Sequence, residues 1–288
     1  MKSISTRGFL QLAGVLTGAL LLVACGRQAP EPAAAPLATA PASAAAPAPA
    51  KVYVVGTDAA YAPFESQNEM AEIVGFDIDV LKAVAAKGGF DLKFVNTPWE
   101  GIFNALEQGD RDLVISAVTI TPERLQTMDF SAPYFDARQL IAVPASSKVT
   151  KFLELKKLKV GVQTGTTGDE AVTKLQGKTS ANIKRFESTP LALKELEAGG
   201  LDAVVADNGV IIHYVANNPG GKFRTVADPT FAPEQYGIAL KKGNAELLAK
   251  VNQGLAAIQA DGSYAALYQK YFGTAPAMAA SAASAPAK

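Results

Sequence analysis

Short apolar runs alternate with amphipathic segments along the middle of the chain. Residues 51–57 are apolar and rich in β-branched side chains, which predicts a buried strand. Residues 76–87 carry apolar side chains at helical spacing and end at a glycine pair, which predicts a helix. Strand–helix units in this order are typical of an α/β fold with a mostly parallel sheet. The alternation continues with strands expected at 91–95 and 112–116 and helices expected at 99–108 and from residue 121.

The same order of elements occurs a second time. Helix stops and strand starts of the two units match at a constant spacing of 90 residues, as in Gly109 and Gly199. Two such units predict two lobes, each with a mostly parallel sheet flanked by helices. The second unit is expected to contain strands at 159–163, 182–186 and 201–206 and helices at 167–176, 189–198 and 208–216.

Three further elements follow: a strand at 235–240 and helices at 244–259 and 261–272. If they return to the first lobe, two strand-like segments must cross between the lobes, near 140–143 and 231–238. We therefore expect a discontinuous lobe 1 and a continuous lobe 2 that carries the hinge strands. The expected boundaries are 51–139 and 237–273 for lobe 1 and 140–236 for lobe 2.

The two ends of the chain differ from this repeating part. Lys2 and Arg7 precede a short apolar run, and small residues precede Cys25, as in a secretory signal with the lipobox of bacterial lipoproteins. The alternative is an ordinary signal peptide with a chance cysteine. Alanine and proline dominate the following segment, which favours an extended tether. We expect a lipoprotein signal peptide at 1–24, a lipidated Cys25 with a linker at 25–50, and a disordered tail at 274–288.

Composition narrows the functional classes. Apolar residues make up 49% and charged residues 19% of the chain, which is enough to fill a core. Lys plus Arg and Asp plus Glu number 27 each, so the chain lacks the basic excess of a nucleic-acid binder. One Cys and one His exclude a disulfide framework and a multi-histidine metal site. We expect neither a metal nor a cofactor.

Polar and aromatic side chains follow the expected strand ends. Ligands of open α/β sheets bind beyond the carboxyl ends of the strands, so these residues form the candidate site. The first unit contributes Asp58, Tyr61, Trp99, Ser116, Ala117, Thr119 and Arg124, and the second contributes Gln163, Thr166, Thr167 and Asp207.

This set of groups suits an amino-acid zwitterion. Arg124 and the helix start at Thr166 can bind an α-carboxylate from opposite lobes. Asp207 and Thr119 can accept hydrogen bonds from an α-ammonium group. Each residue also has a purely structural interpretation; Asp207, for example, could simply cap the helix that follows it.

The ligand side chain would meet three further residues. Tyr61 and Trp99 offer aromatic faces for stacking or cation–π contact, although both could belong to the core. Asp58 could accept an amide or a cationic side chain, or could satisfy only its own turn.

Several motifs together resemble those of bacterial extracytoplasmic solute-binding proteins of family 3, the polar amino-acid-binding components of ABC transporters. The resemblance extends over 52–272 and includes similarity to glutamine-binding and lysine/arginine/ornithine-binding proteins. It implies a type II periplasmic-binding fold, with two α/β lobes that are joined by two hinge strands and close over one ligand. The motifs are Gly56-Thr57-Asp58, Tyr61-Ala62-Pro63-Phe64, Gly75-Phe76-Asp77-Ile78-Asp79, Thr119-Ile120-Thr121-Pro122-Glu123-Arg124, Asp129-Phe130-Ser131-Ala132-Pro133-Tyr134 and Gln235-Tyr236-Gly237-Ile238-Ala239.

The resemblance also implies roles for individual residues. Arg124 would hold the ligand carboxylate and Asp207 its amino group, while Asp58 would face the ligand side chain. Ala117 can contribute only its backbone. Gln163 stands where glutamine binders carry a lysine, so the choice among glutamine, arginine and lysine stays open.

The function expected from these residues is capture of a polar or basic amino acid for an ABC importer. We expect an extracytoplasmic, lipid-anchored monomer that delivers its ligand to permease subunits and is not an enzyme. The alternative is a periplasmic dehydratase on the same fold, with Asp58 and Asp207 as its acid–base pair.

Overall fold

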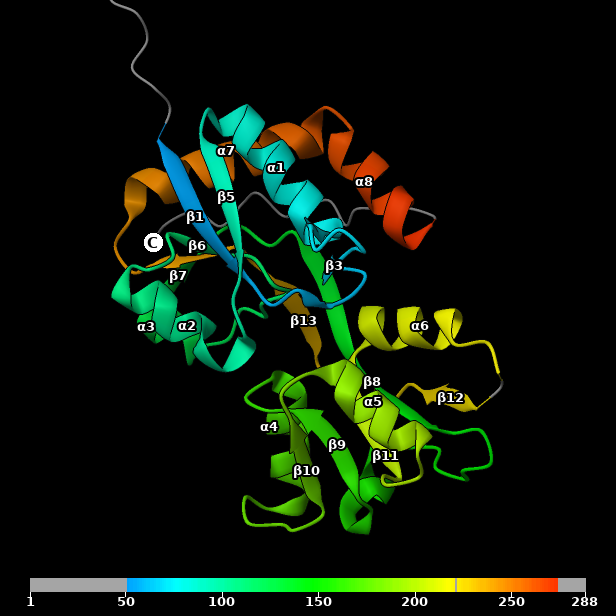
Figure 1. Ribbon diagram of the computed structural model, residues 1–288. Coiled ribbons are helices and arrows are strands. Elements are labelled where there is room, and N and C mark those ends of the chain that lie inside the picture. Colours follow the sequence, from blue (N-terminus) through cyan, green and yellow to red (C-terminus); the bar gives the residue numbers. More distant parts are fainter. Residues whose placement is uncertain (1–50, 221, 274–288) are drawn as a thin grey trace, which may run out of the picture. The chain divides into compact units, whose positions relative to one another are not determined.

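The computed structural model describes residues 51–220 and 222–273. The expected signal peptide, Cys25, the linker up to residue 50 and the tail at 274–288 lie outside these residues. Within the described part, the strands gather into two main sheets with helices packed against them (Figure 1). The predicted two-lobed α/β architecture is confirmed.

Lobe 1 contains strands β1 (Val52–Thr57), β5 (Asp91–Asn96), β6 (Leu113–Val114), β7 (Met128–Phe130) and β14 (Ala239–Lys241), and helices α1 (Phe76–Gly88), α2 (Trp99–Gln108), α3 (Arg124–Thr127), α7 (Ala245–Ala260) and α8 (Ser263–Phe272). Its sheet has the order β5-β1-β6-β14-β7. β1 is parallel to β5 and β6, whereas β14 is antiparallel to β6 and β7. A small antiparallel sheet of β2 (Ala60–Tyr61), β3 (Glu65–Gln67) and β4 (Ile73–Val74) completes the lobe.

Lobe 2 contains strands β8 (Phe135–Pro144), β9 (Val160–Gln163), β10 (Ile183–Phe186), β11 (Ala203–Asp207) and β12 (Phe223–Val226), with helices η1 (Phe152–Lys157), α4 (Thr167–Gln176), α5 (Thr189–Glu197) and α6 (Asn208–Asn217). The sheet order is β10-β9-β11-β8-β12. β9 is parallel to β10 and β11, and β8 runs antiparallel to β11 and β12.

The internal repeat corresponds to equivalent elements of the two lobes. α2 is followed by Gly109 and α5 by Gly199, and both glycines have a positive φ, near 87° and 81°. Each is followed by a buried strand, β6 or β11. The two lobes therefore use the same helix stop before the strand that leads to the cavity.

The prediction of a single strand at 235–240 is wrong. It divides into β13 (Pro233–Tyr236), which pairs with β8, and β14, which pairs inside the lobe 1 sheet. Gly237 lies between them, where a Cβ atom would come within 2.9 Å of the Ile120 side chain. The break lets the chain turn from one sheet to the other at a crowded position.

The crossing segments lie slightly earlier than expected. β13 pairs antiparallel with residues 135–138 at the start of β8, whereas 141–144 pair with β12 inside the lobe 2 sheet. At this joint the rings of Phe135 and Tyr236 stack with centroids 5.3 Å apart. Val210 of α6 also belongs to the lobe 1 aromatic core, so the two lobes pack directly against each other beside these strands.

The helix expected from residue 121 is only one turn long. Thr121 does accept a hydrogen bond from the Arg124 N–H at 3.2 Å, as an N-terminal cap would. The helical turn ends at Thr127, however, because residues 128–130 enter the sheet as β7. The short element places Arg124 beside the gap between the lobes.

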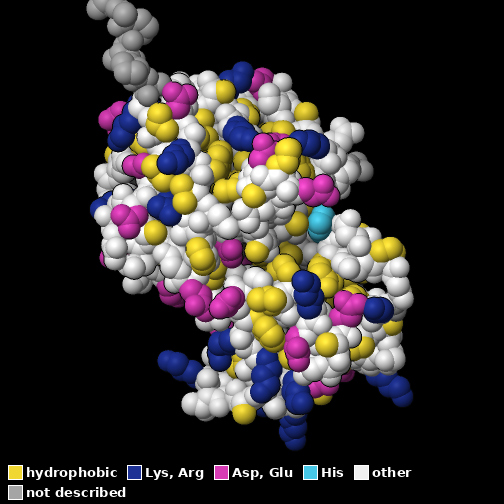
Figure 2. Space-filling view, viewed as in Figure 1, with side chains coloured by type: hydrophobic (Ala, Val, Ile, Leu, Met, Phe, Trp, Pro, Cys, Tyr) yellow, Lys and Arg dark blue, Asp and Glu magenta, His cyan; other side chains and the backbone are white. Residues whose placement is uncertain are grey.

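The surface of lobe 2 carries many exposed lysines, such as Lys156 and Lys157. Figure 2 shows Lys and Arg side chains projecting from the outer end of this lobe. No helix within 51–220 and 222–273 has both the length and the apolar character of a membrane span.

Candidate ligand-binding site

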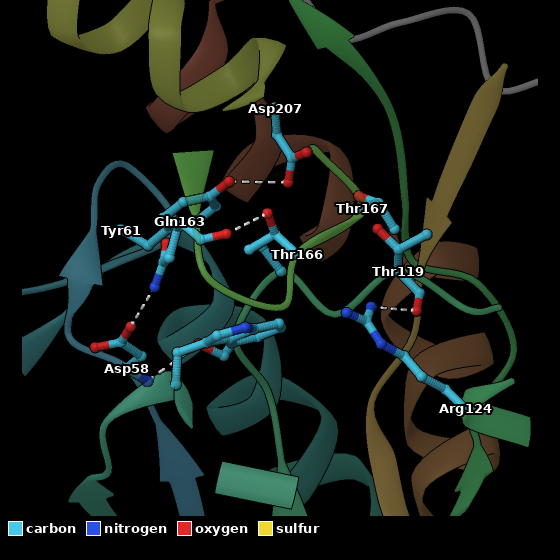
Figure 3. A pocket seen from close by; sticks show the side chains of 11 residues that line it. Asp58, Tyr61, Thr119, Arg124, Gln163, Thr166, Thr167 and Asp207 are labelled. Carbon is cyan, nitrogen blue, oxygen red and sulfur yellow. Dashed lines mark hydrogen bonds between the residues drawn. The ribbon is translucent and has the colours of Figure 1, made fainter. Parts of the chain in front are cut away.

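One cavity between the lobes brings together all eleven residues of the candidate site (Figure 3). Arg124 is the basic side chain among the lining residues, and Asp58 and Asp207 are the acidic ones. The guanidinium and the two carboxylates thus border the same enclosed space.

Two buried carboxyl groups hydrogen-bond to the part of lobe 1 that lines the cavity. The Ser116 hydroxyl donates to Glu65 Oε1 at 2.9 Å, and the Ala117 N–H donates to Asp77 Oδ2 at 2.7 Å. Both Glu65 and Asp77 are fully buried. Burial raises the pKa of Asp77 to about 6, and burial together with the charge of Asp77 raises the pKa of Glu65 well above its ordinary value.

These contacts hold the backbone at Ala117 in the left-handed region, with φ near 46°. Such a conformation in a residue other than glycine persists only where the surroundings enforce it. The carboxyl pair thereby fixes the segment that follows β6, which forms part of the cavity wall.

Asp58 lines the cavity from lobe 1 and reaches across to lobe 2. Its carboxylate accepts a hydrogen bond from Gln163 Nε2 at 3.1 Å. Figure 3 shows the Asp58 and Gln163 side chains pointing toward each other. Burial raises the pKa of Asp58, and the hydrogen bond from Gln163 opposes the rise.

Arg124 is positioned by aromatic rings and by backbone carbonyl groups. Its guanidinium carbon lies 5.4 Å from the Trp99 ring centroid and 5.1 Å from that of Phe103. Nη1 donates to the Thr119 carbonyl at 2.9 Å, and Nη2 donates to the Gly165 carbonyl of lobe 2 at 3.4 Å. Burial lowers the pKa of Arg124, which shows that its charge is partly desolvated. Trp99 therefore supports Arg124 as well as bordering the cavity.

The first turn of α4 forms the lobe 2 side. The Thr166 hydroxyl accepts a hydrogen bond from the Asp169 N–H at 3.2 Å, so Thr166 is the N-cap of α4. Thr167 follows at the first helical position. The positive end of the helix dipole and its free N–H groups favour an anion here.

Asp207 ends β11 and is fully enclosed by polar partners. Its Oδ2 accepts hydrogen bonds from the hydroxyls of Tyr61, at 3.0 Å, and Tyr236, at 2.6 Å, and its Oδ1 accepts one from Gln139 Nε2. Burial, and to a lesser extent the nearby charge of Glu234, raises the pKa of Asp207 to about 6. Its carboxylate is desolvated and would gain from a cationic partner.

The sequence model of one protein family, the bacterial extracellular solute-binding proteins, family 3, matches residues 53–274 of this chain. The chain belongs to this family. A probable histidine-binding protein of Neisseria gonorrhoeae is 45% identical over 261 residues, which cover 90% of this chain and 94% of that protein. The ABC transporter arginine-binding protein 1 of Escherichia coli K12 is 32% identical over 219 residues, 75% of this chain and 89% of that protein.

A solved structure supports the same assignment. The arginine-, lysine-, histidine-binding protein ArtJ of Geobacillus stearothermophilus shares 46% sequence identity and has a TM-score of 0.76. The match covers 79% of this solute-binding protein and 97% of ArtJ. The resemblance drawn from the sequence motifs is confirmed.

Three residues of this solute-binding protein hydrogen-bond to the side chains that line the cavity and were missed from the sequence. Glu234 accepts hydrogen bonds from the hydroxyls of Thr119 and Thr167, Gln139 links Glu234 to Asp207, and Tyr236 donates to Asp207. Gln139 had one usable signal, because it is a polar residue inside an otherwise apolar strand. Within residues 51–220 and 222–273, no group of three or more His, Cys, Asp or Glu side chains is arranged to hold a metal ion.

Proposed function

We propose that this protein captures a free basic L-amino acid between its lobes and delivers it to the permease of an ABC importer. The observation that carries the proposal is the arrangement of Arg124, Asp207 and Asp58 around one cavity. These three groups can pair with the α-carboxylate, the α-ammonium and a cationic side chain, respectively. A polar side chain such as that of glutamine was also expected, and the relatives add histidine to the set of ligands to be tested.

Arg124 would bind the α-carboxylate together with the N-terminus of α4. A guanidinium can form two parallel hydrogen bonds with a carboxylate, and the helix N–H groups supply further donors. Arg124 already contacts the Gly165 carbonyl of lobe 2. A carboxylate held by both lobes would favour the closed state, because it gains all of its contacts only there.

Asp207 would bind the α-ammonium, assisted by the hydroxyl of Thr119. Asp58 would accept the ligand's cationic side chain, beside the ring of Tyr61. Gln163 donates to Asp58 and accepts from the Thr189 hydroxyl at 3.1 Å, so its amide is a fixed part of the wall. A wall that ends in a buried carboxylate favours a cation over a neutral side chain.

The remaining organisation is part of the same proposal. The sheet topology supports a discontinuous lobe 1, expected at 51–139 and 237–273, and a lobe 2 expected at 140–236, with β8 and β13 as the segments that cross between them. A monomer that is lipid-anchored at Cys25 outside the cytoplasm, with the linker expected at 25–50, would place the lobes within reach of a membrane-embedded permease. The dehydratase alternative gains no support, because Asp58 and Asp207 are both engaged in fixed hydrogen bonds.

The test is isothermal titration calorimetry against the twenty amino acids at pH 7.5, followed by a search for product. We expect stoichiometric heat with arginine, lysine or histidine and an unchanged ligand afterwards. Arg124→Ala should abolish the binding while leaving the unfolding midpoint within a few degrees. Arg138→Ala, an exposed arginine on β8, is the matched control and should bind normally. A wild-type protein that binds none of the twenty, or that converts its ligand, refutes the proposal.

A further inference from the structure

Glu234 lies behind the proposed site, on the strand that connects the lobes. It belongs to β13 and lines a groove on the outer surface together with Thr119 and Thr167, the same two threonines that line the inner cavity. The two threonines therefore form a wall with the cavity on one side and the Glu234 carboxylate on the other.

One oxygen of Glu234 bridges the two lobes. Oε2 accepts the hydroxyl proton of Thr119, from lobe 1, at 2.7 Å and that of Thr167, from lobe 2, at 2.8 Å. The other oxygen, Oε1, accepts a hydrogen bond from Gln139 Nε2 at 2.9 Å. The same Gln139 nitrogen also donates to Asp207. The carboxylate is thus tied to both lobes and, through one amide group, to Asp207.

This geometry fixes the direction of two hydrogen bonds. An ionised carboxylate can only accept, and a threonine hydroxyl has a single proton. The protons of Thr119 and Thr167 therefore point away from the cavity, toward Glu234. Thr167 also accepts a hydrogen bond from Gln139 Nε2 at 3.1 Å, which uses one of its two lone pairs. Only the remaining oxygen lone pairs can face a ligand, so these hydroxyls act as acceptors. An acceptor suits an ammonium group and repels a carboxylate.

We propose that Glu234 is a positioning residue of the ligand site. It holds the hydroxyls of Thr119 and Thr167 as acceptors, so that they and Asp207 together select the α-ammonium end of the ligand. It also joins the two lobes when both threonines face it. This inference rests on the proposed function, because it assigns a role to Glu234 in the same site.

The substitution Glu234→Gln tests the role with little change in shape. A glutamine amide can donate from Nε2 to the threonine oxygens, which would turn their protons toward the cavity. Glu123→Gln is the matched control: Glu123 is exposed, acts on Arg124 only through its charge, and precedes it in the chain. Both variants lose one negative charge near the site, but only the first changes the threonine hydrogen bonds.

The probes are L-arginine and 5-guanidinopentanoate, which lacks only the α-ammonium. If the screen selects another amino acid, that acid and its desamino analogue take their place. Calorimetry measures the affinity for the amino acid. The analogue binds more weakly, so its affinity is measured from the shift of the unfolding midpoint at millimolar concentrations of the analogue. In Glu234→Gln we expect arginine to bind about ten- to a hundredfold more weakly. The analogue should bind as well as it does to the wild type, or better, and Glu123→Gln should change neither by more than about twofold.

A merely structural role would weaken both ligands by the same factor, and that result would overturn the inference. So would arginine binding within twofold of wild type in Glu234→Gln. A wild-type protein that binds none of the twenty amino acids refutes the proposed function itself, and this assignment falls with it. If wild type binds and Arg124→Ala does not, while Glu234→Gln is unaffected, only the role of Glu234 is refuted.

Discussion

The substitution Asp207→Asn should make the ligand-free protein more stable while it removes ligand binding. Burial and the charge of Glu234 raise the pKa of Asp207 from its ordinary value of 3.8 to about 6. A rise of this size corresponds to about 3 kcal/mol that the folded protein loses by keeping the group ionised. Asparagine keeps an oxygen for the Tyr61 and Tyr236 hydroxyls but loses the oxygen that faces Gln139, which costs about 1 kcal/mol. The net gain should be about 1–2 kcal/mol.

The gain depends on pH in a defined direction. Because the pKa of Asp207 is raised in the folded state, its contribution to stability is fully present below pH 3.8 and is lost as the pH rises through about 6. At pH 8 the variant should therefore unfold roughly 2–8 °C above wild type in a thermal melt followed by circular dichroism. As the pH falls from 7 toward 4, the difference in unfolding midpoint should shrink and then change sign. Wild type becomes the more stable protein because its Asp207 carboxyl group is then neutral.

Calorimetry on the same samples should show the opposite effect on function. Without the carboxylate, the ligand ammonium loses its charged partner, and affinity should fall about a hundredfold or more. Asp110→Asn, an exposed site in lobe 1, serves as the control and should change neither property. The reasoning is wrong if Asp207→Asn unfolds below wild type at pH 8, or if the difference in midpoint is the same at pH 8 and pH 5.

Two further predictions concern selectivity and packing. Asp58→Asn should weaken the binding of arginine and lysine about tenfold or more, but that of glutamine less than threefold, as measured by calorimetry. If the ratio of arginine to glutamine affinity is unchanged, Asp58 does not contact the ligand side chain. Gly254→Ala in α7 should destabilise the protein by about 1–3 kcal/mol in urea unfolding, because the added Cβ would lie 2.2 Å from the Val84 carbonyl oxygen of α1. Gly101→Ala in α2 is its control: nothing lies within 4 Å of the added Cβ, so stability should rise by up to about 1 kcal/mol. Equal effects of the two glycine substitutions would contradict the packing argument.

Apolar periodicity was enough to predict most of the regular elements, because burial of one face is what selects them. The helices at 99–108 and 167–176 agree with α2 and α4 residue for residue. The eleven candidate residues follow from the strand order, since the carboxyl ends of neighbouring parallel strands point to the same edge of a sheet. The structure places all of them around one cavity.

The parts that could not be predicted depend on contacts between distant segments. Glu234 precedes Tyr236 in a stretch that reads as an ordinary strand, and only its pairing with the start of β8 brings its carboxylate to Thr119 and Thr167. Gln139 acquires its role in the same way, from the register that sets it opposite Asp207. Local patterns carry no information on such pairings, because register between distant strands is set by tertiary packing.

Each charged group around the cavity lies where burial disfavours its charge, and this supports the proposal of a basic amino acid as the ligand. Burial raises the pKa of Asp58 and Asp207 and lowers the pKa of Arg124, so each group is less stable when charged than it would be in water. A ligand with one carboxylate and two cationic groups would supply an opposite charge to all three at once. Its binding energy would come partly from relieving these desolvation penalties. Ligand affinity and the stability of the empty protein should therefore change in opposite directions when the charge at Asp207 is removed.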